Sequence, residues 1–152
     1  MAFVSNSGYT AVAKRIVYPD STNTSFPFAW MEIGSGSNAA TDSVALQSAM
    51  ANATTDSGLI RASMDVGTGT AADGRYIATS TGTDSVNGDT AWFRNTWTCK
   101  VTSIASGVKE CGVFNSATNG DMLAYGTFPT AIPMGTGDTL QVTWSVQVKT
   151  GA

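Results

Sequence analysis

Hydrophobic and polar residues alternate along the second half of the chain, in short stretches separated by segments typical of turns. The clearest stretch covers residues 139–149, whose apolar members are Leu140, Val142, Trp144, Val146 and Val148. A period of two is typical of a β-strand with one buried and one solvated face. Shorter stretches occur at residues 59–66, 75–81, 90–102, 108–114 and 121–128, and the segments between them are rich in Gly, Asn, Asp and Ser. The pattern therefore predicts an all-β protein.

The alternation also predicts which side chains of two of these strands face the core. The residues expected to point inward are Trp97, Cys99, Val101, Cys111 and Val113. Glu110 and Gly112 are expected to face out. We expect Cys99 and Cys111 to be buried thiols, and a disulfide between neighbouring strands remains the alternative.

The first third of the chain has a different pattern. Residues 1–23 predict an N-terminal arm or a first strand. Residues 24–33 predict a strand that either lies at a sheet edge or enters the sheet late, because Pro27 cannot donate a ladder hydrogen bond. Residues 38–58 predict one short helix, capped by Asp42.

Together these elements predict an antiparallel β-sandwich, with a jelly roll as one arrangement of its strands. The 152 residues suffice for one domain with a core of its own. We expect residues 24–152 to form this single domain, preceded by the arm.

Composition excludes most kinds of active site. Only 12% of the residues are charged, the net charge is −3, and there is no His. Without His, the Ser-His-Asp mechanism and His-based zinc sites are excluded. Nothing in the sequence brings the two glutamates, Glu32 and Glu110, together as an acid/base pair, and the aspartates are scattered through turns. We therefore predict a protein that is not an enzyme, with no cofactor and no metal.

The same composition bears on partners and location. No basic run is present to neutralise phosphates, so we expect no nucleic-acid partner. The longest apolar stretch, residues 26–31, is too short to span a bilayer, and residues 1–10 lack the features of a secretory signal. We accordingly expect no membrane association and synthesis in a cytoplasm.

Aromatic residues supply one candidate surface. The aromatic residues that exceed what the clearly inward positions require are Tyr9, Tyr18, Phe26, Phe28, Trp30, Tyr76, Trp92 and Phe93. Aromatic side chains on a polar, weakly charged surface are typical of a sugar-stacking platform or a protein interface. The competing interpretation is that Trp30 and Trp92 fill the core.

Several strand motifs, in a fixed order, resemble a known group of proteins. They are Glu110 to Phe114, Met122-Leu-Ala124, Gly137-Asp-Thr-Leu140 and Val142-Thr-Trp144, preceded by a strand ending in Gly34-Ser-Gly36. In this order they resemble small virion structural proteins of tailed bacteriophages, over about residues 26–149. Cys111 departs from the pattern, because an aliphatic residue is expected there.

The resemblance implies a component of a phage particle, either a capsid decoration (cement) protein or a domain of a tail-fibre or tail-tip protein. A single domain leaves no room for a fibre shaft, so we predict a decoration protein on the outer capsid surface that binds the major capsid protein and stabilises contacts between coat subunits. A homo-oligomer is expected, with a trimer favoured over a dimer. The candidate coat-protein contacts are the apolar residues of the arm, Phe3, Val4, Tyr9, Val12, Ile16 and Tyr18.

Two alternatives remain open. A tail domain that binds host-surface glycan or receptor would use Trp30, Tyr76 and Trp92. A carbohydrate-binding module of a secreted enzyme is the second, and the absent signal sequence argues against it.

Overall fold

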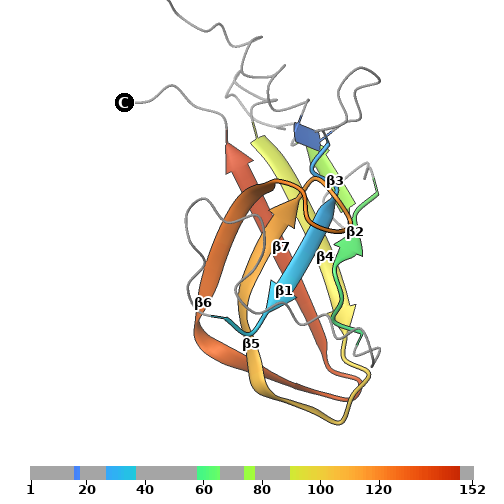
Figure 1. Cartoon of the computed structure of the whole chain (residues 1–152), viewed down its shortest axis with the longest axis vertical. Coiled ribbons are helices and arrows are strands. Elements are labelled where there is room, and N and C mark those ends of the chain that lie inside the picture. The colour runs from blue at the N-terminus through green and yellow to red at the C-terminus, as the bar shows by residue number, and fades with distance from the viewer. Residues whose placement is uncertain (1–15, 18–26, 37–57, 66–73, 78–89, 148–152) are drawn as a thin grey trace, which may run out of the picture.

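The protein is a β-sandwich built from two antiparallel sheets (Figure 1). The computed structural model describes residues 16–17, 27–36, 58–65, 74–77 and 90–147. One sheet has the strand order β2-β1-β5-β6 and the other the order β3-β4-β7. The strands are β1 (Trp30–Gly34), β2 (Ala62–Ser63), β3 (Gly74–Ile77), β4 (Thr90–Thr98), β5 (Ser103–Phe114), β6 (Met122–Gly135) and β7 (Thr139–Gln147). The predicted all-β sandwich is thus confirmed.

The described residues do not test two finer predictions, the jelly roll and the short helix. A jelly roll has eight strands, whereas the described residues form seven, so that arrangement stays a prediction. The helix predicted over residues 38–58 lies outside the described residues except for Gly58. Within the described part of the chain, no helix has the length and apolar character that crossing a membrane requires.

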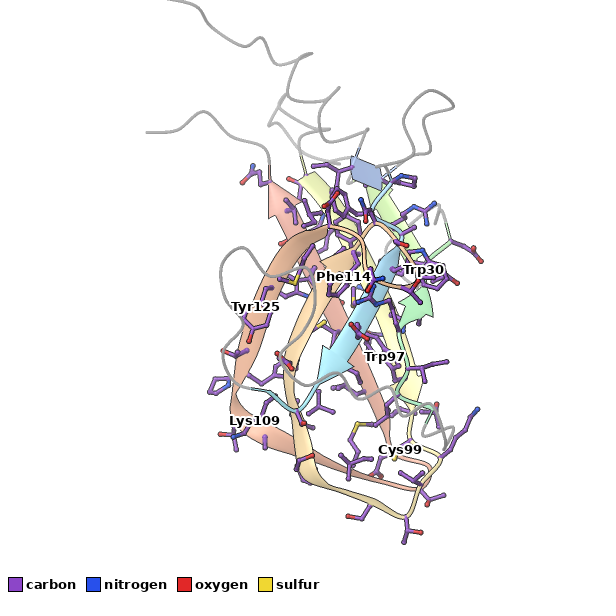
Figure 2. All side chains as sticks on the ribbon, in the orientation of Figure 1. Trp30, Trp97, Cys99, Lys109, Phe114 and Tyr125 are labelled. Carbon is purple, nitrogen blue, oxygen red and sulfur yellow. The ribbon has the colours of Figure 1, made fainter. Side chains whose placement is uncertain are left out.

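The core lies between the two sheets and follows the predicted alternation. In β7 the exposed polar residues alternate with more buried apolar ones, and in β4 the inward row is Ala91, Phe93, Asn95 and Trp97. Trp97 and Cys99 are both buried (Figure 2). From the other sheet, Met31 and Ile33 of β1 complete the core with Cys111 and Val113 of β5. These side chains exclude water from the space between the sheets, which is the main source of stability in such a sandwich.

The strand predicted over residues 24–33 corresponds to β1, which enters its sheet late; this is one of the two alternatives predicted for it. It begins at Trp30, after Pro27, and then pairs with β5 on one side and β2 on the other. Pro27 therefore removes no hydrogen bond from the ladder.

Two boundaries differ from the sequence prediction. Strand β5 begins at Ser103, within a segment expected to be a turn, and β6 continues through Pro129 and Pro133 to Gly135. Proline fits there because β6 is an edge strand, and the β5–β6 register shifts accommodate the irregular pairing.

The cysteines are free and buried, as predicted. The alternative, a disulfide between neighbouring strands, is wrong, because both thiols are free and β4 and β5 belong to different sheets. Cys99 follows β4, where its N–H donates to Asp138 O (2.8 Å) and its carbonyl accepts from Gly137 N (2.8 Å). The chain thus crosses from one sheet to the other between β4 and β5. The alternation of apolar and polar residues alone does not reveal such a connection.

Candidate functional site

The two glutamates of the chain lie on one face of one sheet. Strand register pairs Glu32 with Gly112 and Gly34 with Glu110, so the glutamates are diagonal neighbours on the face of β1 and β5 that points away from the other sheet. This proximity was not expected from the sequence, because the two residues belong to strands far apart in the chain. Glu110 and Gly112 point away from the core, as predicted, but the expectation that this face is solvated is wrong, because both residues are buried.

Each glutamate is held by a neighbouring group. Arg61 Nη2 donates to Glu32 Oε2 at 2.7 Å, and the two side chains are only 9% and 7% exposed. Glu110 Oε1 accepts a hydrogen bond from Gly36 N at 3.0 Å. These carboxylates therefore act as hydrogen-bond acceptors that join segments of the fold.

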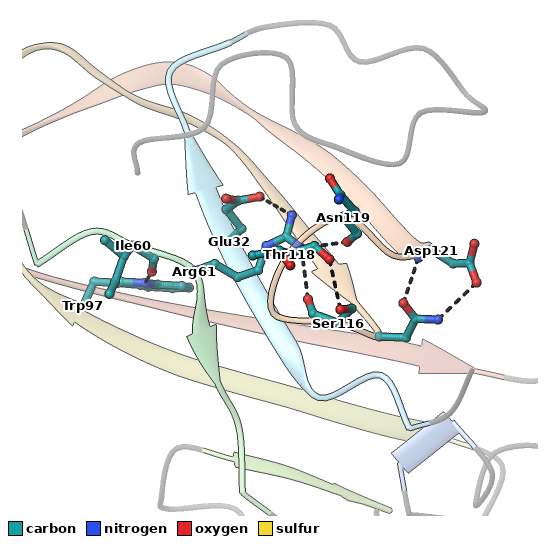
Figure 3. A network of polar contacts seen from close by, with 9 residues as sticks. Glu32, Ile60, Arg61, Trp97, Ser116, Thr118, Asn119 and Asp121 are labelled. Carbon is teal, nitrogen blue, oxygen red and sulfur yellow. Dashed lines mark hydrogen bonds and ion pairs between the residues drawn. The ribbon is translucent and has the colours of Figure 1, made fainter. Parts of the chain in front are cut away.

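Arg61 connects three segments on this face (Figure 3). Besides Glu32, its guanidinium donates to Ser116 O (3.0 Å) and Asn119 O (2.9 Å) in the β5–β6 loop. Its Cζ also lies 3.8 Å from the centre of the Phe114 ring. One side chain thus fixes the segment before β2, strand β1 and the loop, using most of the donors in its planar fork.

The loop has its own internal support. Asn115 Oδ1 accepts from Asp121 N (2.7 Å), while its Nδ2 donates to Asp121 Oδ2 (3.1 Å). Asn119 adopts φ 55°, a left-handed conformation that Asn tolerates better than most residues. The loop therefore presents its carbonyls to Arg61 in a defined geometry.

The opposite side of the sandwich has two edge strands. Among the described strands, β6 and β7 are the last of their sheets, and a cavity of about 190 Å³ lies between them. Its apolar walls are Cys111, Phe128, Val142 and Trp144. Small-molecule sites usually measure about 300–1,000 Å³, so this cavity is suited to a single side chain.

The two edges differ in how open they are to pairing with another strand. Strand β6 contains two prolines and pairs with β5 through several register shifts, features that protect an edge. Strand β7 pairs with β4 over nine consecutive residues without a shift, and its sequence contains neither proline nor a charged residue. Among the described strands, β7 is therefore the edge best suited to accept an additional strand.

The residues predicted to contact a coat protein fall mostly outside the described residues: Phe3, Val4, Tyr9, Val12 and Tyr18. Ile16 is described, and it is buried in the core of this chain. Its carbonyl accepts from Phe28 N (3.0 Å), and the adjacent Val17 carbonyl accepts from Arg75 Nε (2.6 Å). Ile16 therefore packs inside the domain in this structure, where it is not available to a partner.

The structure does not bring all the aromatic candidates together, and it buries Phe28 and Phe93 in the core. Trp30 is half-buried on the outer face of β1, opposite Phe114 in register, while Trp92 is half-buried on the outer face of β4 in the other sheet. Figure 2 shows Trp30 beside Phe114 at one end of β1. Tyr76 is the register partner of Trp92. Trp30 thus lies on the opposite side of the sandwich from Trp92.

Metal ligands are also not gathered in the described part of the chain, where no group of three or more His, Cys, Asp or Glu side chains meets. The network around Arg61 was missed by sequence reasoning. One signal was present: Glu32 is a single charge within an apolar strand sequence, and such a charge requires a partner when the strand is buried.

Comparison with protein-family models, with curated proteins and with solved structures finds no match to this chain.

Proposed function

We propose that this protein is a non-enzymatic virion structural protein, a decoration protein that binds the outer surface of a phage capsid and stabilises contacts between coat subunits. The proposal starts from the order of strand motifs in the sequence. The observation that carries it furthest is the position of β7 as the last strand of its sheet among the described residues, and β7 is a regular strand of nine residues without proline or charge.

The β7 edge offers a physical mode of binding. An extended segment of a coat subunit would continue the β3-β4-β7 sheet through main-chain hydrogen bonds. One of its apolar side chains would enter the cavity between β6 and β7, next to Phe128 and Trp144. A ligand that binds the assembled shell and not its separated subunits stabilises the shell by mass action, and repetition over the lattice adds avidity.

The surface of the described residues is better suited to binding through the edge of a strand than to binding through a broad apolar face. Among these residues, Ile60 is the one large hydrophobic residue that is strongly exposed. Binding by main-chain hydrogen bonds requires little exposed apolar area, which suits such a surface.

The test is co-sedimentation of the full-length protein with expanded empty heads of the phage that encodes it, and in parallel with whole host cells. We expect saturation on heads at a fixed ratio to the coat subunit. Ser145→Lys places a charge on the exposed face of β7 and should weaken this binding. The matched control is Thr130→Lys, which places the same charge on the proline-protected edge strand β6.

A third variant tests the arm. It lacks residues 1–14, so that Ile16 and Val17 remain in the core. If only this variant loses binding to heads, the arm makes the contact with the capsid and β7 does not. Binding to host cells without binding to heads would refute the proposed decoration function. It would favour the alternative of a tail domain that binds through its aromatic residues.

A further inference from the structure

The β5–β6 loop contains an asparagine followed by a glycine, Asn119 and Gly120, whose chemistry the proposed function does not use. The side-chain amide carbon of an asparagine can be attacked by the backbone nitrogen of the next residue, and glycine obstructs this attack least because it has no Cβ. Asn119 is exposed to solvent and Gly120 is half-buried. The dipeptide therefore has the composition and the access to water that deamidation requires.

The conformation of the loop favours these two residue types at these two positions. Asn119 has φ 55° and Gly120 has φ 80°, both in the left-handed region that glycine adopts most easily and asparagine tolerates. A Cβ at Gly120 would also lie 2.4 Å from Asn115 Oδ1, an atom that accepts a hydrogen bond from Asp121 N. The reactive dipeptide is thus a consequence of how the loop is folded.

The two asparagines of this loop differ in how their side chains are held. The Asn115 amide is bound at both ends, since Oδ1 accepts from Asp121 N and Nδ2 donates to Asp121 Oδ2. The Asn119 side chain and the Gly120 N–H make no hydrogen bond among the described residues. In Figure 3 the dashed line at Asn119 reaches its backbone carbonyl, not its side chain. Direct contacts therefore restrain the amide of Asn115 but not that of Asn119.

The backbone conformation of Asn119 nevertheless keeps the two reacting atoms apart. Deamidation begins when Gly120 N bonds to Asn119 Cγ, and this ring closure requires the nitrogen to lie on the same side of the Cα–C bond as Cβ. In the left-handed region ψ is about +30 to +60°, which places the next nitrogen nearly opposite Cβ about that bond. The peptide group between residues 119 and 120 must therefore turn before the reaction can start.

Arg61 opposes this rotation. Its Nη1 donates to Asn119 O at 2.9 Å, and this oxygen belongs to the peptide group that must turn. The guanidinium is itself held in place, because Nη1 also donates to Ser116 O at 3.0 Å and Nη2 donates to Glu32 Oε2 at 2.7 Å. Arg61 therefore cannot follow the moving carbonyl, and the rotation has to break a hydrogen bond from a charged donor, which is one of the stronger kinds in proteins.

We propose that Asn119 is a deamidation site at which Arg61 sets the rate, because the reaction proceeds only while the Arg61–Asn119 hydrogen bond is broken. Gly120 N then bonds to Asn119 Cγ, and the amide nitrogen leaves as ammonia with the proton that Gly120 N gives up. Water opens the resulting succinimide at one of its two carbonyls, which yields aspartate or isoaspartate. In isoaspartate the former backbone carbonyl, the acceptor for Arg61, becomes a carboxylate. This proposal does not rest on a role in decoration.

The test is incubation of the full-length protein in mildly alkaline buffer, with and without urea, followed by peptide mapping that separates asparagine, aspartate and isoaspartate. We expect conversion at residue 119 in both samples, at least roughly tenfold slower in the native protein than in the urea-unfolded chain. Asn115 should stay intact in the native protein. Equal rates at residue 119 in the two samples, or no conversion in the native one, would overturn the proposal.

Variants separate the role of Arg61 from a general loss of stability. Arg61→Lys keeps a cation for Glu32 and removes the planar fork that reaches the loop carbonyls, and the double variant Arg61→Met with Glu32→Leu removes the donor without leaving a buried charge. Both should accelerate conversion at residue 119, the double variant by roughly tenfold.

The chain offers two controls for these variants. Arg94→Met removes an arginine that binds Thr143 in the other sheet, and it should leave the rate at residue 119 unchanged. The second Asn-Gly pair of the chain, at residues 87–88, lies outside the described residues and serves as an internal reference for conversion elsewhere in the same molecule. An unchanged rate at residue 119 in both Arg61 variants, or an equal acceleration at residue 87, would overturn the role of Arg61.

Discussion

The indole N–H of Trp144 in β7 donates across the sandwich to Sγ of Cys111 in β5, at 3.3 Å. The same ring lies against Gly126 of β6, where a Cβ would lie 2.7 Å from its Cη2. Trp144 therefore joins the two sheets by a polar contact and by close packing. Both contacts lead to measurable consequences.

The first consequence concerns pH. Burial raises the pKa of the Cys111 thiol from 9.0 to about 12; the hydrogen bond from Trp144 acts in the opposite direction, and nearby Glu32 adds to the increase. Between these two values the unfolded chain has lost this proton while the folded protein keeps it. The stabilisation is therefore complete below pH 9.0 and is lost as the pH rises toward about 12.

Urea denaturation at about pH 8 and about pH 10 measures this effect. The wild-type protein should lose more stability between the two values than Cys111→Ala does, since the variant lacks the titrating group. Equal losses in the two proteins would show that Cys111 ionises normally in the folded state.

Gly126→Ala should destabilise the protein by about 1–3 kcal/mol, because the added methyl group overlaps the Trp144 ring in a packed interface. The comparison is Gly137→Ala, where no atom lies within 4 Å of the new Cβ and only the φ of +89° opposes it. That variant should lose about 1 kcal/mol. A smaller loss at Gly126 than at Gly137, measured by chemical denaturation, would contradict the close packing described for Trp144.

Arg61→Ala should cost about 3–5 kcal/mol, because it leaves the buried Glu32 carboxylate without its cation. The double variant Arg61→Met with Glu32→Leu removes both charges and should recover much of this loss. Free energies of unfolding for Arg61→Met, Glu32→Leu and the double variant give the coupling between the two residues. A coupling near zero would mean that the ion pair does not form in solution.

Asn119→Val should destabilise the β5–β6 loop by about 1–2 kcal/mol, since a β-branched residue strongly disfavours a φ of 55°. Asn119→Gly should be close to neutral at the same position. Amide hydrogen exchange at residues 115–121 would detect the difference locally, and equal exchange in both variants would argue against the left-handed conformation.

The strands were predictable from the sequence where the alternation is local and uninterrupted. Strand β7 shows this best, because its inward and outward positions can be assigned without knowing which strand lies beside it. The extension of β6 was not predictable in this way, since Pro129 and Pro133 are typical of a loop and become compatible with a strand only at a sheet edge.

The candidate sites were less predictable, because they depend on pairing between distant segments. Glu32 and Glu110 become neighbours only through the β1–β5 register. The pocket between the segment 58–62 and β4 lies beside the part of β4 for which the described residues show no pairing with β3. A polar residue in the apolar row of β4 was visible in the sequence, but its missing partner was visible only in the structure.

The β1–β5 pairing also constrains how the chain folds. Met31 and Val113 are register partners, so the larger sheet acquires its central pair only after most of the chain has left the ribosome. Contacts between such distant residues incur the cost of loop closure before they contribute stability, which places two-state β-sandwiches of this kind among proteins that fold in about milliseconds to seconds. Until residue 114 emerges, the apolar face of β1 lacks the strand that pairs with it, and nascent chains are exposed to aggregation during this interval.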